Sequence, residues 1–384
     1  MIPYSRQTID RKDLDNVKKV LLSDFLTQGP EVKKFEKDVK NYLQVKYALA
    51  LNSATSALHV ACLALKLKKG DWLWTVPNTF TASANCGRFC GANVDFVDIN
   101  NKTFNICLKK LETKLKAAKK NKKLPKILVV VHLGGNPSDL LEISKLSKKY
   151  KFKIIEDASH ALGSKYMNSK IGNGKYSSVC VFSLHPVKPI TSGEGGLAVT
   201  NDKKIFEKMK MYGNHGITKT HKNFKNKIKS HWYYEQQLLG FNYRMSDIHA
   251  SLARSQLKKL NKFIQTRNKI AKLYKKEFKN LPLFFQNINK KSLSSYHLFI
   301  IYLNKSILRK NYNFYFNQLR KEKLGVNLHY LPLHKHPYYK GQKKYEDLSN
   351  SEEYSQSAIS IPIFNKFDKQ KIFHVIRILK RVFC

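Results

Sequence analysis

Between about residue 45 and residue 200, short apolar runs alternate with longer amphipathic stretches, and this alternation limits the possible folds more than any other feature. The helical patterns lie at Ala57–Leu67, Ala82–Phe89, Leu108–Lys119 and Leu140–Tyr150. The seven candidate strands are Ala48–Leu51, Trp72–Val76, Val94–Val97, Ile127–His132, Lys153–Glu156, Val179–Ser183 and Leu197–Thr200. Alternation at these lengths predicts an α/β fold with a mostly parallel central sheet and helices on both faces.

The pattern changes after about residue 245. A long lysine-rich helix is predicted from Asp247 to Leu281, followed by an apolar run at Tyr296–Leu303, a helical stretch and a His/Tyr/Pro-rich segment. We interpret residues 1–245 as a large domain and residues 246–384 as a smaller C-terminal α/β domain. In parallel sheets ligands bind beyond the carboxyl ends of the strands, so the chemistry is expected just after each strand.

The chain contains 71 Lys and Arg residues against 27 Asp and Glu, a formal net charge of +44. The lysines are spread over nearly every predicted helix, and the two densest runs, 114–126 and 219–229, contain one aromatic residue between them, Phe224. Grooves that bind single-stranded nucleic acid combine positive charge with stacking aromatics. We therefore predict a solvated basic surface, in keeping with AT-rich codon usage, and no nucleic-acid partner. The positive potential would still attract an anionic substrate.

No run of eighteen apolar residues is present, and the N-terminus lacks the apolar core of a signal peptide. These features predict a cytoplasmic protein with no membrane partner. No pair of cysteines has the spacing of a metal site. Cys86 and Cys90 can share a helix face, but no His or carboxylate partner is evident near them, so neither a metal site nor a disulfide is predicted. The cysteines are Cys62, Cys86, Cys90, Cys107, Cys180 and Cys384.

Polar groups follow several of the predicted strands. Asn52–Leu58 places small hydroxyl residues between a strand and a helix, where a helix N-terminus can hold a phosphate group. The same residues are also common helix caps without any ligand. Glu156-Asp-Ala-Ser-His160 ends a buried strand, where adjacent acids are costly unless they are paired. Asp157 is suited to keep a heterocyclic nitrogen protonated and His160 to bind the same ring; a helix cap and a surface acid are the alternative.

Lys188 follows the hydrophobic strand at Val179–Ser183 and precedes a glycine-rich turn, between Pro186 and Pro189. Most lysines in so basic a chain are surface charges. The two prolines favour a fixed geometry instead, and removal from water would lower the pKa of the amine as a Schiff-base lysine requires. A phosphate seat, a ring-nitrogen acid and such a lysine, in this chain order, are the protein groups that pyridoxal phosphate needs.

Over residues 2 to about 380 the chain resembles the DegT-type sugar aminotransferases, which have the aspartate-aminotransferase-like (type I) fold. The resemblance rests on Ser23–Pro30, Asn52–His59, Gly70–Trp74, Glu156–Ala161, His185–Lys188, Glu194–Gly196 and Gly240–Met245. It implies an enzyme with pyridoxal 5'-phosphate bound in the large domain, and with substrate and dimer contacts in its N-terminal segment. Two departures concern substrate fit and ring contacts: Leu184 replaces the usual Phe, and His132-Leu-Gly-Gly replaces a commoner His-Phe/Tyr-Ala-Gly pattern.

Residue roles follow from the resemblance. The implied catalytic residues are Lys188, which would bind the cofactor covalently, Asp157 on its ring nitrogen, and His160 near the ring's 3-oxygen. The other implied cofactor residues are Ala54, Thr55 and Ser183 around the phosphate, Phe80 on the ring face, and Asn242 from a neighbouring subunit of a homodimer. The implied substrate residues are Tyr4, Asp24, Phe25, Leu26, Thr27, His185, Leu328, His329, Tyr330 and Leu331, with His334, His336, Tyr338 and Tyr339 as an extension that ordinary loop polarity explains equally well.

The segments around Trp72, Trp74 and Leu26-Thr27-Gln28 favour one branch of the family. The resemblance then implies transfer of an amino group from L-glutamate to the C4 keto group of UDP-2-acetamido-2,6-dideoxy-hexos-4-ulose. The product would be UDP-4-amino-4,6-dideoxy-N-acetyl-altrosamine, an intermediate of pseudaminic acid. The alternative is an aminotransferase that acts on another nucleotide-linked keto-sugar. Lys188 argues against the related sugar dehydratases, which have histidine at this position.

Overall fold

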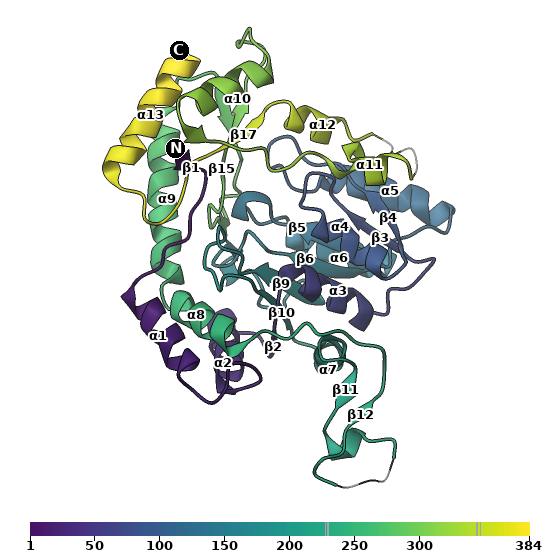
Figure 1. The fold of residues 1–384 in the computed structure, drawn as a ribbon. Coiled ribbons are helices and arrows are strands. Elements are labelled where there is room, and N and C mark those ends of the chain that lie inside the picture. Colours follow the sequence, from purple (N-terminus) through teal and green to yellow (C-terminus); the bar gives the residue numbers. More distant parts are fainter. Residues whose placement is uncertain (227, 229, 343–344, 346) are drawn as a thin grey trace.

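A seven-stranded sheet forms the centre of the computed structural model (Figure 1), which describes residues 1–226, 228, 230–342, 345 and 347–384. In spatial order the strands are β2 (Tyr47–Leu51), β10 (Gly196–Thr200), β9 (Val179–Ser183), β6 (Lys153–Asp157), β5 (Ile127–Val131), β3 (Trp72–Thr75) and β4 (Asn93–Phe96). The five strands from β9 to β4 are parallel, whereas β10 runs antiparallel to both β9 and β2. The sheet is therefore mixed but mostly parallel.

Helices cover both faces of this sheet because alternate strand residues point to opposite sides. In β5, Leu128 and Val130 pack into one buried cluster, and Ile127 and Val129 pack into the other. The first cluster is completed by α2 (Pro30–Leu43), α5 (Leu108–Lys120), α6 (Leu140–Tyr150) and α8 (Asp247–Leu257). The second is completed by α3 (Ala54–Ala64), α4 (Ala82–Phe89) and α7 (Lys203–Gly213).

All seven predicted strands form this sheet, with bounds that differ by at most one residue at either end, and the predicted helices correspond to α3–α6. One prediction was wrong: the single helix from Asp247 to Leu281 is two helices, α8 and α9 (Leu260–Glu277), which run in different directions (Figure 1). The break coincides with contacts to α1 (Arg11–Leu21), because Lys259 Nζ lies 2.6 Å from the buried Asp13 carboxylate and Gln256 donates to the same oxygen. Periodicity alone does not reveal such an anchor.

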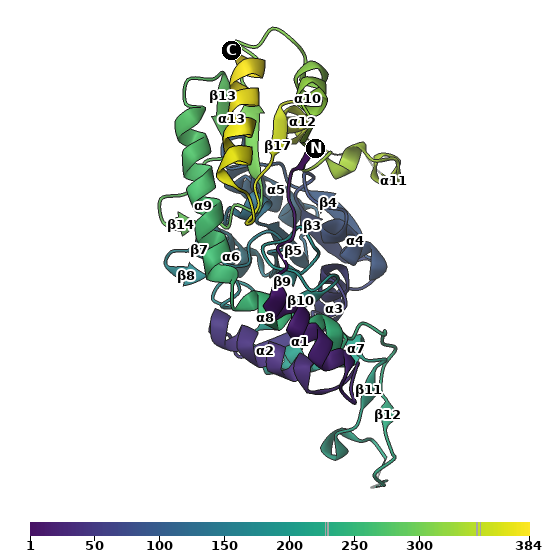
Figure 2. The same ribbon diagram turned by 60° about the vertical axis from the view of Figure 1, so that its left-hand side comes forward.

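A second, smaller sheet lies beside the large one (Figures 1 and 2). Its antiparallel order is β13 (Leu283–Phe285), β15 (Phe299–Leu303) and β17 (Ala358–Ile361). It shares a third buried cluster with α9, α10 (Tyr312–Lys321) and α13 (Lys369–Phe383). Helix α8 packs with the large sheet, and the N-terminal β1 (Ile2–Pro3) pairs with β16 (Leu324–Gly325). Each predicted domain is therefore packed with a segment from the other part of the sequence. The domain boundary at residue 245/246 stays a prediction.

A hairpin arm, described over residues 214–226, 228 and 230–243, projects from the body of the molecule (Figure 2). It contains β11 (Ile217–Thr218), η2 (His221–Asn223) and β12 (Glu235–Gln236). Trp232 and Leu239 on the arm are 76% and 80% exposed. The remaining short elements are β7 (Lys165–Tyr166), β8 (Ser169–Lys170), β14 (Ser292–Leu293), η1 (Leu133–Gly135), η3 (Leu333–Lys335), α11 (Pro337–Lys340) and α12 (Ser349–Ser355).

The side chain of Asp247, in the first turn of α8, accepts hydrogen bonds from the backbone at the start of α2. Helix α2 begins after Gly29, which has no capping side chain, and the fully buried Asp247 carboxylate accepts the N–H groups of Gly29 (2.8 Å) and Glu31 (2.7 Å) instead. Replacing Asp247 by Ala leaves these donors unpaired, so we expect the free energy of unfolding to fall by about 2–3 kcal/mol. Urea unfolding measures this loss. Asp247→Asn should lose less, and Asp15→Ala, at an exposed ion pair, should change stability by less than about 1 kcal/mol; equal losses in all three variants would contradict this role of Asp247.

Candidate active site

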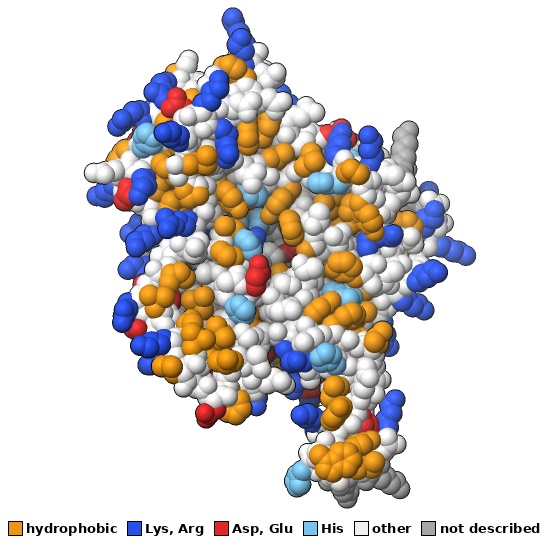
Figure 3. Space-filling view, viewed as in Figure 1, with side chains coloured by type: hydrophobic (Ala, Val, Ile, Leu, Met, Phe, Trp, Pro, Cys, Tyr) orange, Lys and Arg blue, Asp and Glu red, His pale blue; other side chains and the backbone are white. Residues whose placement is uncertain are grey.

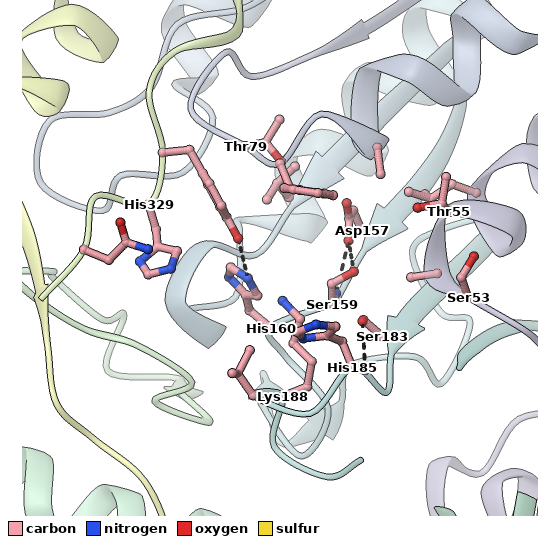
Figure 4. Close-up of a pocket in the computed structure, with 18 of the residues that line it drawn as sticks. Ser53, Thr55, Thr79, Asp157, Ser159, His160, Ser183, His185, Lys188 and His329 are labelled. Atoms are coloured by element: carbon pink, nitrogen blue, oxygen red, sulfur yellow. Dashed lines mark hydrogen bonds between the residues drawn. The ribbon is translucent and has the colours of Figure 1, made fainter. Parts of the chain in front are cut away.

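A cavity of about 460 Å³ opens at the carboxyl ends of the parallel strands, as the sequence predicted. Asp157 ends β6, Ser183 ends β9, and Ala54 begins α3 directly after β2. The segment 327–330 closes the opposite side of this cavity. Figure 4 shows side chains from all these elements converging on one space.

Lys188 lies in a turn just beyond β9 and lines this cavity, on the same side as Asp157 and His160 (Figure 4). Its N–H donates to the carbonyl of His185 (2.9 Å), and Ser5 Oγ donates to the carbonyl of the preceding residue, Val187 (3.1 Å). Removal from water lowers the pKa of the Lys188 amine to about 8, while the Asp157 charge opposes this shift. The lysine is thus held at the sheet edge, where it is partly buried.

Three hydrogen bonds fix the buried Asp157 carboxylate. Ser83 Oγ, from α4, donates to Oδ2 at 2.5 Å, and the Ser159 hydroxyl and N–H donate to Oδ1 at 2.6 and 3.1 Å. Thr79 Oγ1 lies 2.8 Å from Ser83 Oγ and extends the network. These contacts hold the Asp157 carboxylate in one orientation.

The preceding acid, Glu156, points to the other face of the sheet and is paired there. His132 Nδ1 accepts the N–H of Ser138, so its proton lies on Nε2, which donates to Glu156 at 2.9 Å. Ser177 Oγ donates to the second Glu156 oxygen at 2.5 Å. Both acids of the motif are therefore satisfied, as their burial requires.

The start of α3 forms the floor of the cavity near Ala54 and Thr55. Ser53 is the N-cap and accepts the N–H of Ser56 (3.0 Å), which is the capping role that the sequence left open. A Cβ on Gly196 of β10 would overlap the backbone of Ser53 and Ala54, so only glycine allows the strand to pass this close. The helix start is open to an anion, because its first N–H groups have no partner within the helix.

His160 is held in one tautomer. Its Nδ1 accepts the N–H of Gly134 (3.2 Å), so Nε2 carries the proton and donates to Tyr330 Oη at 3.1 Å. Burial lowers the pKa of His160 well below its usual value, and the Lys188 charge adds to this effect. Burial likewise lowers the pKa of His329 to about 3. Both rings are neutral at physiological pH.

The structure brings most of the predicted residues to this cavity. Those that line it are Tyr4, Ala54, Thr55, Phe80, Asp157, His160, Ser183, His185, Lys188, Leu328, His329 and Tyr330. Those outside it are Asp24, Phe25, Leu26 and Thr27, in the connection from α1 to α2, together with Leu331 and Asn242. Asn242 pairs with Asn214 at the base of the arm, and the neighbouring Tyr243 carbonyl accepts the N–H of Asn52.

Sequence reasoning missed several residues of the site. Thr79 and Ser83 lie close to Phe80 in the sequence, and Ser159 lies inside the Glu156–His160 motif, so their hydroxyl groups were a usable signal. Glu194 and Asn327 also line the cavity, and His297 lies behind it with its ring 4.3 Å from that of His160. These contacts join distant segments, so neither periodicity nor local spacing reveals them.

Lysine and arginine side chains are distributed around the visible face in Figure 3 rather than gathered in one patch, and a hollow with histidines lies near its centre. Across the described residues, no group of three or more His, Cys, Asp or Glu side chains is arranged to hold a metal ion. Within the same part of the chain, no helix combines the length and apolarity needed to cross a membrane.

The lowered pKa of Lys188 makes the stability of the cofactor-free protein depend on pH. Between about pH 8 and the ordinary value of 10.5, the unfolded chain binds more protons at this lysine than the folded protein does, so stability rises with pH. We expect this one residue to contribute no more than about 3 kcal/mol over that range. Urea unfolding at several pH values should give a steeper rise for the wild type than for Lys188→Met. Identical slopes would mean that the amine is solvated.

Comparison with known proteins places the chain in a family. The model of the DegT/DnrJ/EryC1/StrS aminotransferase family matches residues 7–380. A Campylobacter jejuni UDP-4-amino-4,6-dideoxy-N-acetyl-beta-L-altrosamine transaminase is 39% identical over 100% of both chains. The structure of Helicobacter pylori PseC, an aminotransferase involved in the biosynthesis of pseudoaminic acid, is 31% identical, with a TM-score of 0.91 over 100% of this chain and 99% of that one.

A sugar aminotransferase from Streptococcus pneumoniae, Spr1654, solved in its PLP form, is 25% identical, with a TM-score of 0.88 over 99% of this chain and 98% of that one. The expected aspartate-aminotransferase-like fold, the family and the cofactor are thereby confirmed. This chain belongs to the DegT/DnrJ/EryC1/StrS aminotransferase family and is a sugar-nucleotide aminotransferase that depends on pyridoxal phosphate.

Proposed function

We propose that this enzyme transfers the amino group of L-glutamate to the C4 keto group of UDP-2-acetamido-2,6-dideoxy-hexos-4-ulose. The product is UDP-4-amino-4,6-dideoxy-N-acetyl-altrosamine, an intermediate of pseudaminic acid, and the reaction takes place in the cytoplasm. The observation that carries the chemistry is the desolvated Lys188 amine in the same cavity as the buried Asp157 carboxylate. The full-length similarity to the Campylobacter jejuni transaminase supports the choice of sugar.

The side chains around the cavity fit pyridoxal phosphate. The fixed Asp157 carboxylate suits the ring nitrogen, and Phe80, which lines the cavity and is 57% exposed, is free to cover a ring face. Ala54 and Thr55 at the start of α3, with Ser183 at the end of β9, suit the phosphate. When bound, the cofactor supplies an electron sink for the carbanion formed at the amino-bearing carbon.

The residues of the chain supply the rest of the chemistry. With a pKa of about 8, the Lys188 amine is able to take a proton from the α-carbon of glutamate and to deliver one to C4 of the sugar. Asp157, whose carboxylate is fixed by three hydrogen bonds, would pair with the ring nitrogen and favour a positive charge there. His160, neutral and with Nε2–H directed to Tyr330, holds that phenol in place and would lie beside the cofactor ring.

The sugar nucleotide is expected to lie against the opposite wall. Tyr4, Leu328, His329 and Tyr330 come from the N-terminal segment and the 327–330 segment, which meet where the Tyr4 and His329 rings lie 4.9 Å apart. His329 Nδ1 is fixed 2.9 Å from Ser360 Oγ, so its ring has one orientation. Asp24–Thr27 and Leu331 remain proposed contacts for the outer part of the substrate.

We further propose a homodimer whose subunits share their active sites. Asn242 does not line the cavity of its own chain, and the arm next to it exposes Trp232 and Leu239 to solvent. Exposed apolar side chains on a projecting hairpin favour contact with another subunit. Under this proposal, Asn242 completes the phosphate site of the neighbouring chain.

Activity on a panel of nucleotide-linked keto-sugars tests the substrate. With glutamate as donor, we expect the UDP-linked 2-acetamido-2,6-dideoxy 4-keto sugar to react at least about tenfold faster than its relatives, as measured by 2-oxoglutarate release. Faster turnover of a different keto-sugar would overturn the choice of substrate but leave the chemistry intact.

Lys188→Ala should abolish turnover and the covalent link to the cofactor, whereas the exposed control Lys175→Ala should retain both. Steady-state turnover by Lys188→Ala would refute the assigned role of the lysine.

Mixing two inactive variants tests the shared site. If Asn242 acts across the dimer, a subunit with Lys188→Ala and a subunit with Asn242→Ala together form one intact site. Random exchange should then restore about a quarter of the wild-type activity. Each variant alone, taken through the same exchange, should stay inactive. No recovery in mixed dimers, verified by mass, would show that Asn242 acts within its own chain.

A further inference from the structure

Three cysteines and a histidine gather outside the active-site cavity, where α3 packs against α4. His59 and Cys62 lie three residues apart on α3, and Cys86 and Cys90 lie four residues apart at the end of α4, so each pair shares one helix face. The Cys62 thiol hydrogen-bonds with Cys86 and Cys90, and Cys90 also hydrogen-bonds with His59. The sequence-based statement that no histidine partners these cysteines was therefore wrong, because the histidine comes from the other helix.

The members of this thiol cluster (His59, Cys62, Cys86 and Cys90) differ in their access to solvent. Cys62 and Cys86 are buried, whereas Cys90 is partly exposed. Hydrogen bonding to Cys62, and then to His59, lowers the pKa of Cys90 to about 6, while burial raises the pKa of Cys62. At neutral pH the accessible sulfur is therefore a thiolate and its buried neighbour is a thiol, which is the arrangement of an oxidisable cysteine beside a resolving one.

We propose that Cys90 is a modification site for hydroperoxides and that its oxidation closes a disulfide with Cys62. The Cys90 thiolate attacks one peroxide oxygen, the O–O bond breaks, and the other oxygen leaves as hydroxide and becomes water. The sulfur of Cys62 then loses its proton and attacks the resulting sulfenic acid. The S–O bond breaks, a second water leaves, and the S–S bond forms. The Cys90 thiolate and the Cys62 thiol together lose two electrons, and hydrogen peroxide takes these, the Cys62 proton and one proton from solvent to become two water molecules.

The thiol cluster contacts the base of the arm. His59 Nδ1 lies 3.2 Å from Tyr243 Oη, and the His59 ring lies 4.8 Å from that of Phe241. These two residues flank Asn242 and stack on each other at 4.9 Å. Oxidation of Cys90 removes the thiolate that hydrogen-bonds with His59. The modification therefore occurs one side chain away from the segment that carries Asn242.

Mapping of disulfides in the holoenzyme tests this proposal. The fully reduced enzyme is treated with equimolar hydrogen peroxide, alkylated with iodoacetamide and digested without reduction. We expect a linked Cys62–Cys90 peptide that dithiothreitol removes, whereas Cys107 and the exposed Cys384 remain alkylated as free thiols. A Cys62–Cys86 link, or oxidation of Cys384 with Cys90 left free, would overturn the proposal.

Two variants separate the roles of the sulfurs. Cys62→Ser should still be oxidised at Cys90 but should stop at the sulfenic acid, which dimedone captures. The matched control Cys107→Ser should form the Cys62–Cys90 link as the wild type does. A thermal transition close to that of the wild type shows that each variant is folded. If Cys62→Ser does not fold, the rates at which Cys90 and Cys384 of the wild type are alkylated test the reactivity of Cys90 instead. At pH 7 Cys90 should react with iodoacetamide faster than Cys384, and the opposite order would refute a reactive Cys90.

Discussion

Removal of one amine from water is the constraint on which the site depends. Lys188 is partly buried in the turn that follows β9, and its pKa falls to about 8 because the charged form loses hydration there. A nearby carboxylate would normally favour the charged form of the amine and raise its pKa again. The Asp157 charge opposes the fall in the Lys188 pKa but does not cancel it, and hydrogen bonds from Ser83 and Ser159 fix the Asp157 carboxylate in place. One cavity therefore contains both a fixed carboxylate and an amine that is easily deprotonated.

Asp157 shares the cavity with Lys188 because neighbouring side chains of a strand point to opposite faces of the sheet. Along β6, Glu156 and Asp157 point to opposite faces, so that one meets His132 and Ser177 while the other meets the cavity. The same alternation assigns the residues of β5 to two different clusters. The functional edge is thus a consequence of strand geometry, and the adjacent acids carry different roles because their surroundings differ.

Local patterns predicted the strands and the motifs well, because those signals lie within a few residues of one another. The strands of the large sheet, Lys188 after β9 and Asp157 at the end of β6 all follow from apolar runs and their flanking residues. Contacts between distant segments were not predictable in this way. The helix predicted from Asp247 to Leu281 is broken where Lys259 meets Asp13, and Ser83 reaches Asp157 across 74 residues of sequence. The partner of His160, Tyr330, comes from 170 residues away.

The pairing of β2 at one edge of the large sheet affects the order in which the protein folds during synthesis. Strand β2 is the outermost strand, and its neighbour in the sheet is β10, so residues 47–51 pair with residues 196–200. A ribosome that has released only the first 190 residues has produced β2 and the start of α3 but not the strand against which they lie. Loop closure over such a distance is slow. The phosphate seat beside Gly196 therefore forms late in synthesis, after the parallel strands β3 to β6 have emerged.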